Sequence, residues 1–280
     1  MNTATLLSEA RTFLFVPGNR PERFEKAAQS GADAVVLDLE DSVPGSAKQA
    51  AREAIAAQWL ELQRSGIPVV VRINALGSEA AAADLAGIAR LSGLAALMVP
   101  KAESSDALAD VHHRLGGVPL VPLVESAAGL DALKALAAAA GVLRLALGHI
   151  DFLADTGMSC DEDESELTPL RFAVAMATRL CNLAPAVDGV TVQTDDAPRL
   201  RADTLRARRF GFGAKLCIHP RQIVVVHEAF APSPAELAWA RRVVEADRQA
   251  DGAAVRLDGR MVDKPVVLQA QRILARAAPR

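Results

Sequence analysis

Polar and charged side chains recur in this chain directly after short apolar runs. The residues concerned are Asp38, Glu40, Arg72, Lys101, Glu125 and Asp151. Glu125 and Asp151 follow consecutive runs, and two neighbouring carboxylates repel each other unless a cation lies between them. Two carboxylates suit Mg²⁺, which leaves its other coordination positions to water and substrate oxygens. With Arg72 and Lys101 nearby, these residues predict a site for a carboxylate substrate that reacts through an enolate.

Each of these positions also has a purely structural interpretation. Asp41 and Ser126 can cap the helices that follow them. Arg72 can form a packing ion pair with Glu40, and His219 can be a structural histidine. The recurrence of polar residues at the same point of successive runs favours a shared site over separate structural roles.

The apolar runs alternate with helical patterns, which predicts repeated βα units and a parallel sheet. The expected strands span residues 12–16, 34–39, 69–73, 96–99, 120–124, 143–147, 187–192 and 214–218. The expected helices between them span residues 22–30, 48–65, 80–91, 106–115, 129–140, 168–183 and 197–210. Eight such units favour an α/β fold of the (β/α)8 TIM barrel type, in which active sites lie at the carboxyl ends of the strands.

The sequence pattern changes near residue 230. Residues 1–230 contain no linker and are expected to form one catalytic barrel domain, whereas residues 231–280 predict a C-terminal helical extension. Because this segment is short for an independent domain, we expect it to pack on its own barrel or on a neighbouring subunit.

Composition argues against several classes of protein. The 280 residues carry a formal net charge of −3 and only 4% aromatic residues, so we expect no nucleic-acid partner. No apolar run approaches the ~18 residues of a membrane span, and the three cysteines lack disulfide or zinc spacing, so we expect no membrane partner and a cytoplasmic location. The sequence signatures of P-loop, GxSxG and HExxH enzymes are absent.

Several separated motifs resemble the citrate lyase β-subunit family, within the HpcH/HpaI aldolase superfamily that also contains malyl-CoA and citramalyl-CoA lyases. The motifs are TFLFVPGNRP at 12–21, VLDLEDSV at 36–43, VRIN at 71–74, VPK at 99–101, ES at 125–126, CIHPRQ at 217–222 and MVDKP at 261–265. The resemblance covers nearly the whole chain. It implies a Mg²⁺-dependent lyase that cleaves or forms a carbon–carbon bond between an acetyl thioester and a 2-oxo acid.

The resemblance also implies roles for individual residues. Glu125 and Asp151 match metal ligands, and Arg72 matches the residue that binds the substrate carboxylate and oxyanion. Asp263 matches an acid/base that reaches the active site of a neighbouring subunit, in a homotrimer or a hexamer of two trimers. Lys101, together with Glu125, is expected to contact substrate.

Supporting roles are expected for two further acids and for a basic group. Asp38 and Glu40 would not contact the substrate themselves but would orient the side chains that bind it. Arg11 and Arg20, with Arg23 and Lys26, could contact the phosphates of coenzyme A, although they could equally be a solvated helix start.

Five questions stay open at this stage. His149 could bond a ligand oxygen or fill a changed pocket, and the acidic loop 161–166 could be solvated or form a lid. Asp263 could instead cap the helix expected at 266–277. The substrate could be citramalyl-CoA, malyl-CoA or a citryl thioester, carried by coenzyme A or by an acyl-carrier protein. A malyl-CoA thioesterase and a non-catalytic binding subunit are the alternative functions.

Overall fold

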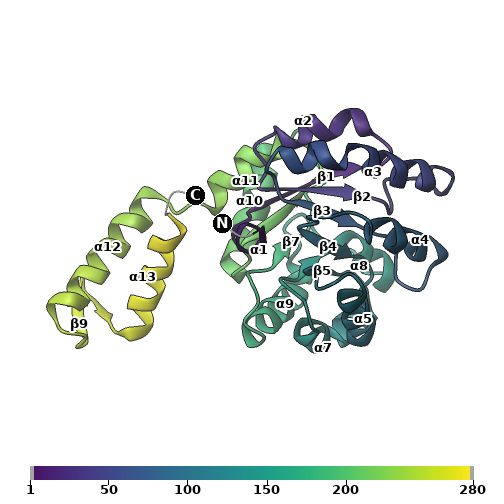
Figure 1. The fold of residues 1–280 in the computed structure, drawn as a ribbon. Coiled ribbons are helices and arrows are strands. Elements are labelled where there is room, and N and C mark those ends of the chain that lie inside the picture. Colours follow the sequence, from purple (N-terminus) through teal and green to yellow (C-terminus); the bar gives the residue numbers. More distant parts are fainter. Residues whose placement is uncertain (1–2, 278–280) are drawn as a thin grey trace. The chain divides into compact units, whose positions relative to one another are not determined.

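The strands of the computed structural model, which describes residues 3–277, close into one parallel barrel (Figure 1). Each strand pairs with the next, and the first pairs with the eighth. The strands are β1 (Thr12–Pro17), β2 (Ala34–Asp38), β3 (Val69–Arg72), β4 (Ala96–Val99), β5 (Leu120–Val124), β6 (Ala146–Leu147), β7 (Val187–Asp188) and β8 (Ala214–Cys217). The expected (β/α)8 TIM barrel is therefore confirmed.

Helices surround the strands and follow them along the chain (Figure 1). They are α1 (Thr3–Glu9), α2 (Phe24–Ala28), α3 (Lys48–Arg64), α4 (Glu79–Ile88), α5 (Ser105–Arg114), α6 (Ala127–Asp131), α7 (Leu133–Ala138), α8 (His149–Thr156), α9 (Thr168–Leu180), α10 (Ala197–Phe210) and α11 (Gln222–Phe230). Short 3₁₀ helices are η1 (Pro21–Arg23), η2 (Gly45–Ala47) and η3 (Ser165–Leu167). No helix was predicted at the position of α8, and α6 and α7 were predicted as one helix.

The strands are apolar on both sides, as expected for a sheet covered inside and outside. All five residues of β2 are buried. One buried cluster contains side chains from all eight strands, among them Phe13, Val36 and Met98. Because the strands form a closed ring, these mutually contacting side chains fill its interior.

Strand β7 is shorter than the run at 187–192 predicted. It ends at Asp188, because the next carbonyl, that of Gly189, accepts a hydrogen bond of 2.7 Å from the Lys215 ammonium instead of from a neighbouring strand. The chain therefore leaves the sheet at Gly189. This early exit shapes the site described below.

Arg144 ties together the segments that precede β1 and β7, at the amino-terminal end of the barrel. Its guanidinium is fully buried and donates to the carbonyls of Leu7 at 2.8 Å and Ala10 at 3.0 Å. It also donates to the Pro185 carbonyl and lies 5.2 Å from the centroid of the Phe13 ring. These bonds close the end of the barrel opposite the carboxyl ends of the strands.

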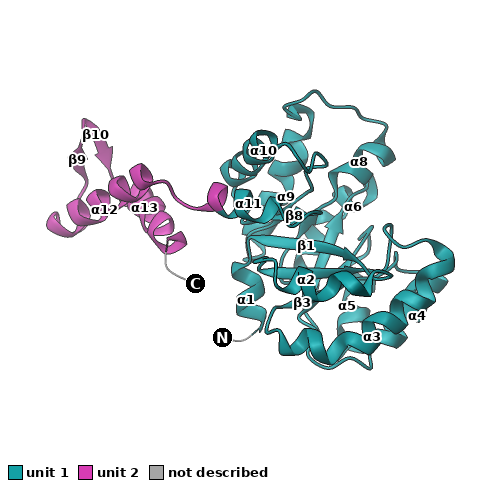
Figure 2. Ribbon diagram, turned by 90° about the horizontal axis from the view of Figure 1, so that it is seen from above, with its two compact units in different colours: residues 1–227 teal, residues 228–280 magenta. Residues whose placement is uncertain are grey.

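A second compact unit begins at Glu228 (Figure 2). It contains α12 (Pro234–Gln249), β9 (Val255–Leu257), β10 (Arg260–Val262) and α13 (Lys264–Arg276), with β9 and β10 paired antiparallel. Ser233 and Glu236 form a capping box at the start of α12. Buried apolar side chains of the two helices form a core of this unit's own. The last three residues of the extension expected at 231–280 lie outside the described residues.

Within residues 3–277, no helix combines the length and apolar character needed to cross a membrane.

We predict that Arg144→Met lowers the free energy of unfolding by about 3 kcal/mol, because three buried hydrogen bonds of about 1 kcal/mol each are lost. Urea denaturation followed by circular dichroism measures this. Arg114→Met on α5 is the matched control, since its ion pair with Asp110 is solvent-exposed and should contribute less than about 1 kcal/mol. Equal effects of the two substitutions would contradict the role of Arg144.

Candidate active site

Glu125 follows β5 directly and is almost completely buried at the carboxyl end of the barrel. Its Oε1 accepts a hydrogen bond of 2.7 Å from the backbone N–H of Lys101. Lys101 adopts φ 45°, in the left-handed region that non-glycine residues seldom occupy. Among the described residues, Oε2 of Glu125 has no hydrogen-bond partner. Within the part of the chain that the structure describes, only one of the two oxygens of this buried carboxyl group therefore accepts a hydrogen bond.

Burial, together with the charges of Glu40 and Asp151, raises the pKa of Glu125 to about 8. A divalent cation would remove this repulsion and would give the free oxygen a partner. In residues 3–277, no group of three or more His, Cys, Asp or Glu side chains forms a metal site. The unpartnered oxygen of Glu125 and the nearby charge of Asp151 fit a Mg²⁺ ion, which takes one or two protein carboxylates and completes its shell with water and substrate.

Asp151 lies in the first turn of α8, a helix that was not predicted from the sequence and that begins soon after β6 ends at Leu147. A carboxylate is favoured at this position by the positive end of the helix dipole. The Asp151 side chain is 41% exposed, and its Oδ1 lies 3.9 Å from Nζ of Lys101. Asp151 is also close enough to Glu125 for its charge to raise the pKa of that buried carboxyl.

Arg72, at the end of β3, forms ion pairs with two carboxylates of the neighbouring β2 segment. Its Nε and Nη2 donate to Asp38 at 2.7 and 2.8 Å, and Nη1 lies 2.8 Å from Oε2 of Glu40. The guanidinium also lies 4.8 Å from the centroid of the Phe15 ring. The ion pair with Glu40 that the sequence allowed is thus present. The one with Asp38 is the stronger contact, because it is bidentate.

These contacts fix the charges of the group. Burial alone would lower the pKa of Arg72, but the bonds to Asp38 and the charge of Glu40 raise it. Burial raises the pKa of Asp38, yet the hydrogen bonds from Arg72 outweigh it, so the net shift is downward. Asp38 is therefore a carboxylate and Arg72 a permanent cation.

Lys101 connects the two halves of the site. Its Nζ donates to Oε1 of Glu40 at 2.8 Å and faces Asp151 across 3.9 Å. Burial raises the pKa of Glu40, against the opposing effects of Arg72 and Lys101. The structure thus brings together Asp38, Glu40, Arg72, Lys101, Glu125 and Asp151, all of which the sequence singled out.

A polar layer beneath the site was not predicted from the sequence. The Lys48 ammonium donates to the carbonyls of Leu39 at 2.9 Å and Glu40 at 3.1 Å and also bonds Asn74. Asn74 in turn donates to Asp84 at 2.6 Å. Lys48 and Asp84 lie within ordinary helical patterns, so only the tertiary structure identifies them.

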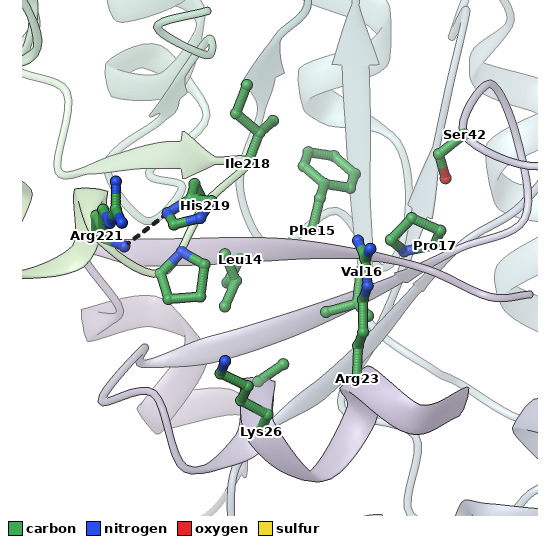
Figure 3. A pocket seen from close by; sticks show the side chains of 12 residues that line it. Leu14, Phe15, Val16, Pro17, Arg23, Lys26, Ser42, Ile218, His219 and Arg221 are labelled. Carbon is green, nitrogen blue, oxygen red and sulfur yellow. Dashed lines mark hydrogen bonds between the residues drawn. The ribbon is translucent and has the colours of Figure 1, made fainter. Parts of the chain in front are cut away.

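A pocket of about 810 Å³ lies at the ends of β1 and β8 and beside α2 (Figure 3). Phe15, which stacks on Arg72, and Ser42, which donates to Asp38, are among its lining residues, so the pocket adjoins the carboxylate site. The rest of the lining comprises apolar residues and the basic side chains Arg23, Lys26, His219 and Arg221.

The basic group expected from the sequence divides in the structure. Arg23 and Lys26 line the pocket, whereas the exposed Arg20 pairs with Glu22 at 2.6 Å. Arg11 directly precedes β1 and is not among the residues that line this pocket, so its contact with coenzyme A stays a prediction.

Two structural alternatives are realised at helix starts. Ser126 caps α6 by accepting a hydrogen bond of 3.1 Å from the Gly129 N–H. In the second unit, Asp263 caps α13 by accepting a bond of 3.5 Å from the Val266 N–H. A role of Asp263 in proton transfer stays a prediction.

The loop at 161–166 is not simply a solvated run of charges. Glu164 forms ion pairs with three arginines, Arg171, Arg199 and Arg206. His149 lies beside it, buried, and burial lowers the pKa of the imidazole, so that the ring is neutral at pH 7. Glu164 thus anchors the loop to α9 and α10.

Comparisons with known proteins agree with this architecture. The family model for HpcH/HpaI aldolase/citrate lyase matches residues 11–220. A Mycobacterium tuberculosis citrate lyase subunit beta-like protein is 37% identical over 274 residues, which cover 95% of this chain and 94% of that protein. A Cereibacter sphaeroides (3S)-malyl-CoA thioesterase is 32% identical over 278 residues, with coverage of 95% and 94%. The crystal structure of M. tuberculosis CitE with magnesium, acetoacetate and coenzyme A has 36% identity and a TM-score of 0.86, with coverage of 96% and 99%.

We predict that the free energy of unfolding of the metal-free protein falls as the pH rises from about 4.5 to about 8, because over this range the folded chain keeps a proton on Glu125 that the unfolded chain has lost. The slope from this one group is at most about 1.4 kcal/mol per pH unit. Denaturation series at several pH values measure it.

In the same series, Glu125→Gln should remove this part of the slope, and Glu61→Gln on the exposed face of α3 should keep it. Added Mg²⁺ should flatten the slope in the wild-type protein, because a cation favours the charged carboxylate. Identical slopes for the wild type and Glu125→Gln would exclude the protonated, buried state of Glu125.

Proposed function

The chain belongs to the HpcH/HpaI aldolase/citrate lyase family, and on that premise we propose that it is a Mg²⁺-dependent carbon–carbon lyase. The family resemblance seen in the sequence motifs is thereby confirmed. The proposed substrate is the coenzyme A thioester of a small hydroxy acid, such as citramalyl-CoA or malyl-CoA. Cleavage would give an acetyl thioester and a 2-oxo acid, and synthesis would run the reverse.

One observation carries this proposal: among the described residues, the buried Glu125 carboxyl has an oxygen without a hydrogen-bond partner, and burial together with the charges of Glu40 and Asp151 raises its pKa. Such an arrangement is costly unless a cation binds. When bound, Mg²⁺ would hold the substrate's carboxylate and adjacent oxygen and would polarise them. The similar CitE structures contain magnesium together with small acids, which supports this assignment.

Arg72 has the remaining hydrogen-bonding capacity that a substrate carboxylate needs. A guanidinium carries five N–H groups, and the hydrogen bonds to Asp38 use two of them, while Nη1 lies in an ion pair 2.8 Å from Oε2 of Glu40. The N–H groups that make no hydrogen bond to Asp38 can donate to a substrate oxygen and offset the charge that grows on it as the carbon–carbon bond breaks. The two carboxylates hold the fork in one orientation, so little reorganisation accompanies the reaction.

The pocket of Figure 3 suits free coenzyme A as the thioester carrier. Its volume of about 810 Å³ falls in the range of cofactor sites, and its apolar floor can cover the pantetheine arm. Arg23, Lys26 and Arg221 supply the positive charge that phosphates require. The relative solved with coenzyme A supports this carrier over an acyl-carrier protein.

Asp263 would move the proton between the thioester carbon and solvent. We propose that it does so in the active site of a neighbouring subunit, within a homotrimer or a hexamer. It stands at the start of α13, between the β9–β10 hairpin and a helix with an apolar face, so the carboxylate is held at a fixed point of the second unit. The cap bond from Val266 uses Oδ1, and the second oxygen can exchange a proton.

The reaction can be tested by incubating a panel of citramalyl-CoA, malyl-CoA and citryl-CoA with Mg²⁺ and measuring the 2-oxo acid and acetyl-CoA formed. We expect cleavage of at least one thioester. Arg72→Lys should lower kcat/KM roughly 10²-fold, because an ammonium cannot reproduce the fork that the two carboxylates and the substrate share.

Arg114→Lys on the surface of α5 serves as the matched control and should keep wild-type activity. Release of free coenzyme A and the intact hydroxy acid would identify a thioesterase instead, as in the Cereibacter relatives. Absence of any reaction, with the thioesters still bound, would leave a binding subunit. Near-normal kcat/KM in Arg72→Lys would limit Arg72 to its structural ion pairs.

We predict that Asp263→Asn keeps the fold and the oligomer but loses activity by roughly 10²–10⁴-fold, because asparagine caps a helix as well as aspartate does but transfers no proton. Asp196→Asn, at the cap of α10, is the matched control and should stay active. Mixing Asp263→Asn with Arg72→Lys under subunit exchange should restore part of the activity. Full activity of Asp263→Asn would remove the residue from the mechanism, and failure of rescue despite exchange would place its action within its own subunit.

A further inference from the structure

His149 is the first residue of α8 and precedes Asp151 by two positions, yet the two side chains lie in opposite environments. The His149 ring is 4% exposed, and it is absent from the lining of the pocket in Figure 3. A ring with this placement does not reach a ligand in that pocket. The contacts of the ring with the surrounding protein therefore determine its role.

On that side the ring occupies a narrow slot. A Cβ atom added to Gly189 would lie only 2.1 Å from Nδ1 of His149 and 2.8 Å from Cε1. Across the ring, Oε1 of Glu164 lies 4.0 Å from Nε2. The slot exists because residue 189 has no side chain.

Both walls of the slot are held by bonds of their own. The Gly189 carbonyl accepts a hydrogen bond of 2.7 Å from the Lys215 ammonium, which also donates to Asp188 at 3.1 Å. Glu164 is fixed by Arg199 and Arg206 at 3.2 and 2.7 Å and by Arg171. Lys215, Asp188 and Arg171 are buried, and Glu164 is tied to three arginines, so both sides of the slot are held in place.

The first turn of α8 lacks a side-chain cap, although the Gly148 N–H donates to the Val124 carbonyl at 3.0 Å and Phe152 packs in a buried cluster. The N-cap of α8 is Gly148, which supplies no side-chain hydrogen bond to the helix. A larger residue is excluded there, because a Cβ on Gly148 would lie 2.2 Å from Oε2 of Glu125. The helix has only eight residues, and a short uncapped first turn is readily frayed.

We propose that His149 is a positioning residue whose ring, seated between Gly189 and Glu164, fixes the first turn of α8 and so aims the Asp151 carboxylate at Glu125. The ring acts by its shape and its place. The part of this inference in which Asp151 is a metal ligand rests on the proposed function. The part in which the His149 ring anchors α8 does not depend on that function.

The test is Gly189→Ala, whose methyl group would displace the ring. Gly189 does not adopt a positive φ, so alanine adds bulk without backbone strain. Calorimetry should show Mg²⁺ affinity reduced roughly 10- to 100-fold, as for other residues that orient metal ligands. Hydrogen exchange of the metal-free protein should become faster in residues 149–156. The matched control is Gly45→Ala, where an added Cβ meets nothing within 4 Å, and it should match the wild type in both measurements.

His149→Ala supplies a second variant, because it removes the ring without adding bulk and should weaken Mg²⁺ binding in the same way. The double variant should bind no more weakly than His149→Ala alone, since the ring with which the new methyl clashes is gone. Wild-type affinity and exchange in both single variants would overturn the proposal. If the wild-type protein bound no Mg²⁺, the proposed function would fail, and the exchange rates alone would decide whether the ring anchors α8.

Discussion

The carboxyl end of the barrel depends on one constraint: it gathers more carboxyl groups than its own cations can neutralise. Glu40 takes both Arg72 and Lys101 as partners. Glu125 is left with a backbone N–H, and Asp151 with an ammonium 3.9 Å away. Burial of a carboxylate without a counter-charge is unfavourable, so binding of a cation at this site would stabilise the folded chain. Stability and ligand binding therefore share the same side chains.

Space decides the rest of the arrangement around these charges. Two glycines, Gly148 and Gly189, allow the Glu125 carboxylate and the His149 ring to lie against the backbone where any side chain would collide with them. The same early exit of β7 that exposes the Gly189 carbonyl to Lys215 opens the slot for the ring. The carboxyl group of Glu125 and the ring of His149 are thus both accommodated by glycines close to the start of α8.

The proposed reaction divides its tasks among different parts of the chain. The carboxylates and Arg72 come from the β2 to α8 part of the barrel, while the basic pocket uses β1, α2 and β8. Phe15 joins the two, because its ring stacks on Arg72 and also lines the pocket. A thioester carrier in the pocket would therefore present its acyl group next to the guanidinium.

The sequence alone determined the barrel and most of the site. Eight apolar runs with polar residues after each are a local pattern, and chain direction in a parallel barrel brings all strand ends to one rim. Glu125, Arg72, Lys101 and Glu40 could therefore be predicted together. What only the tertiary structure decided depends on contacts between distant segments: the helical position of Asp151, the pairing of Arg72 with Asp38 and the ion pairs of Glu164 with three arginines. No periodicity records such contacts, because each depends on where another element ends and on the space that a missing side chain leaves.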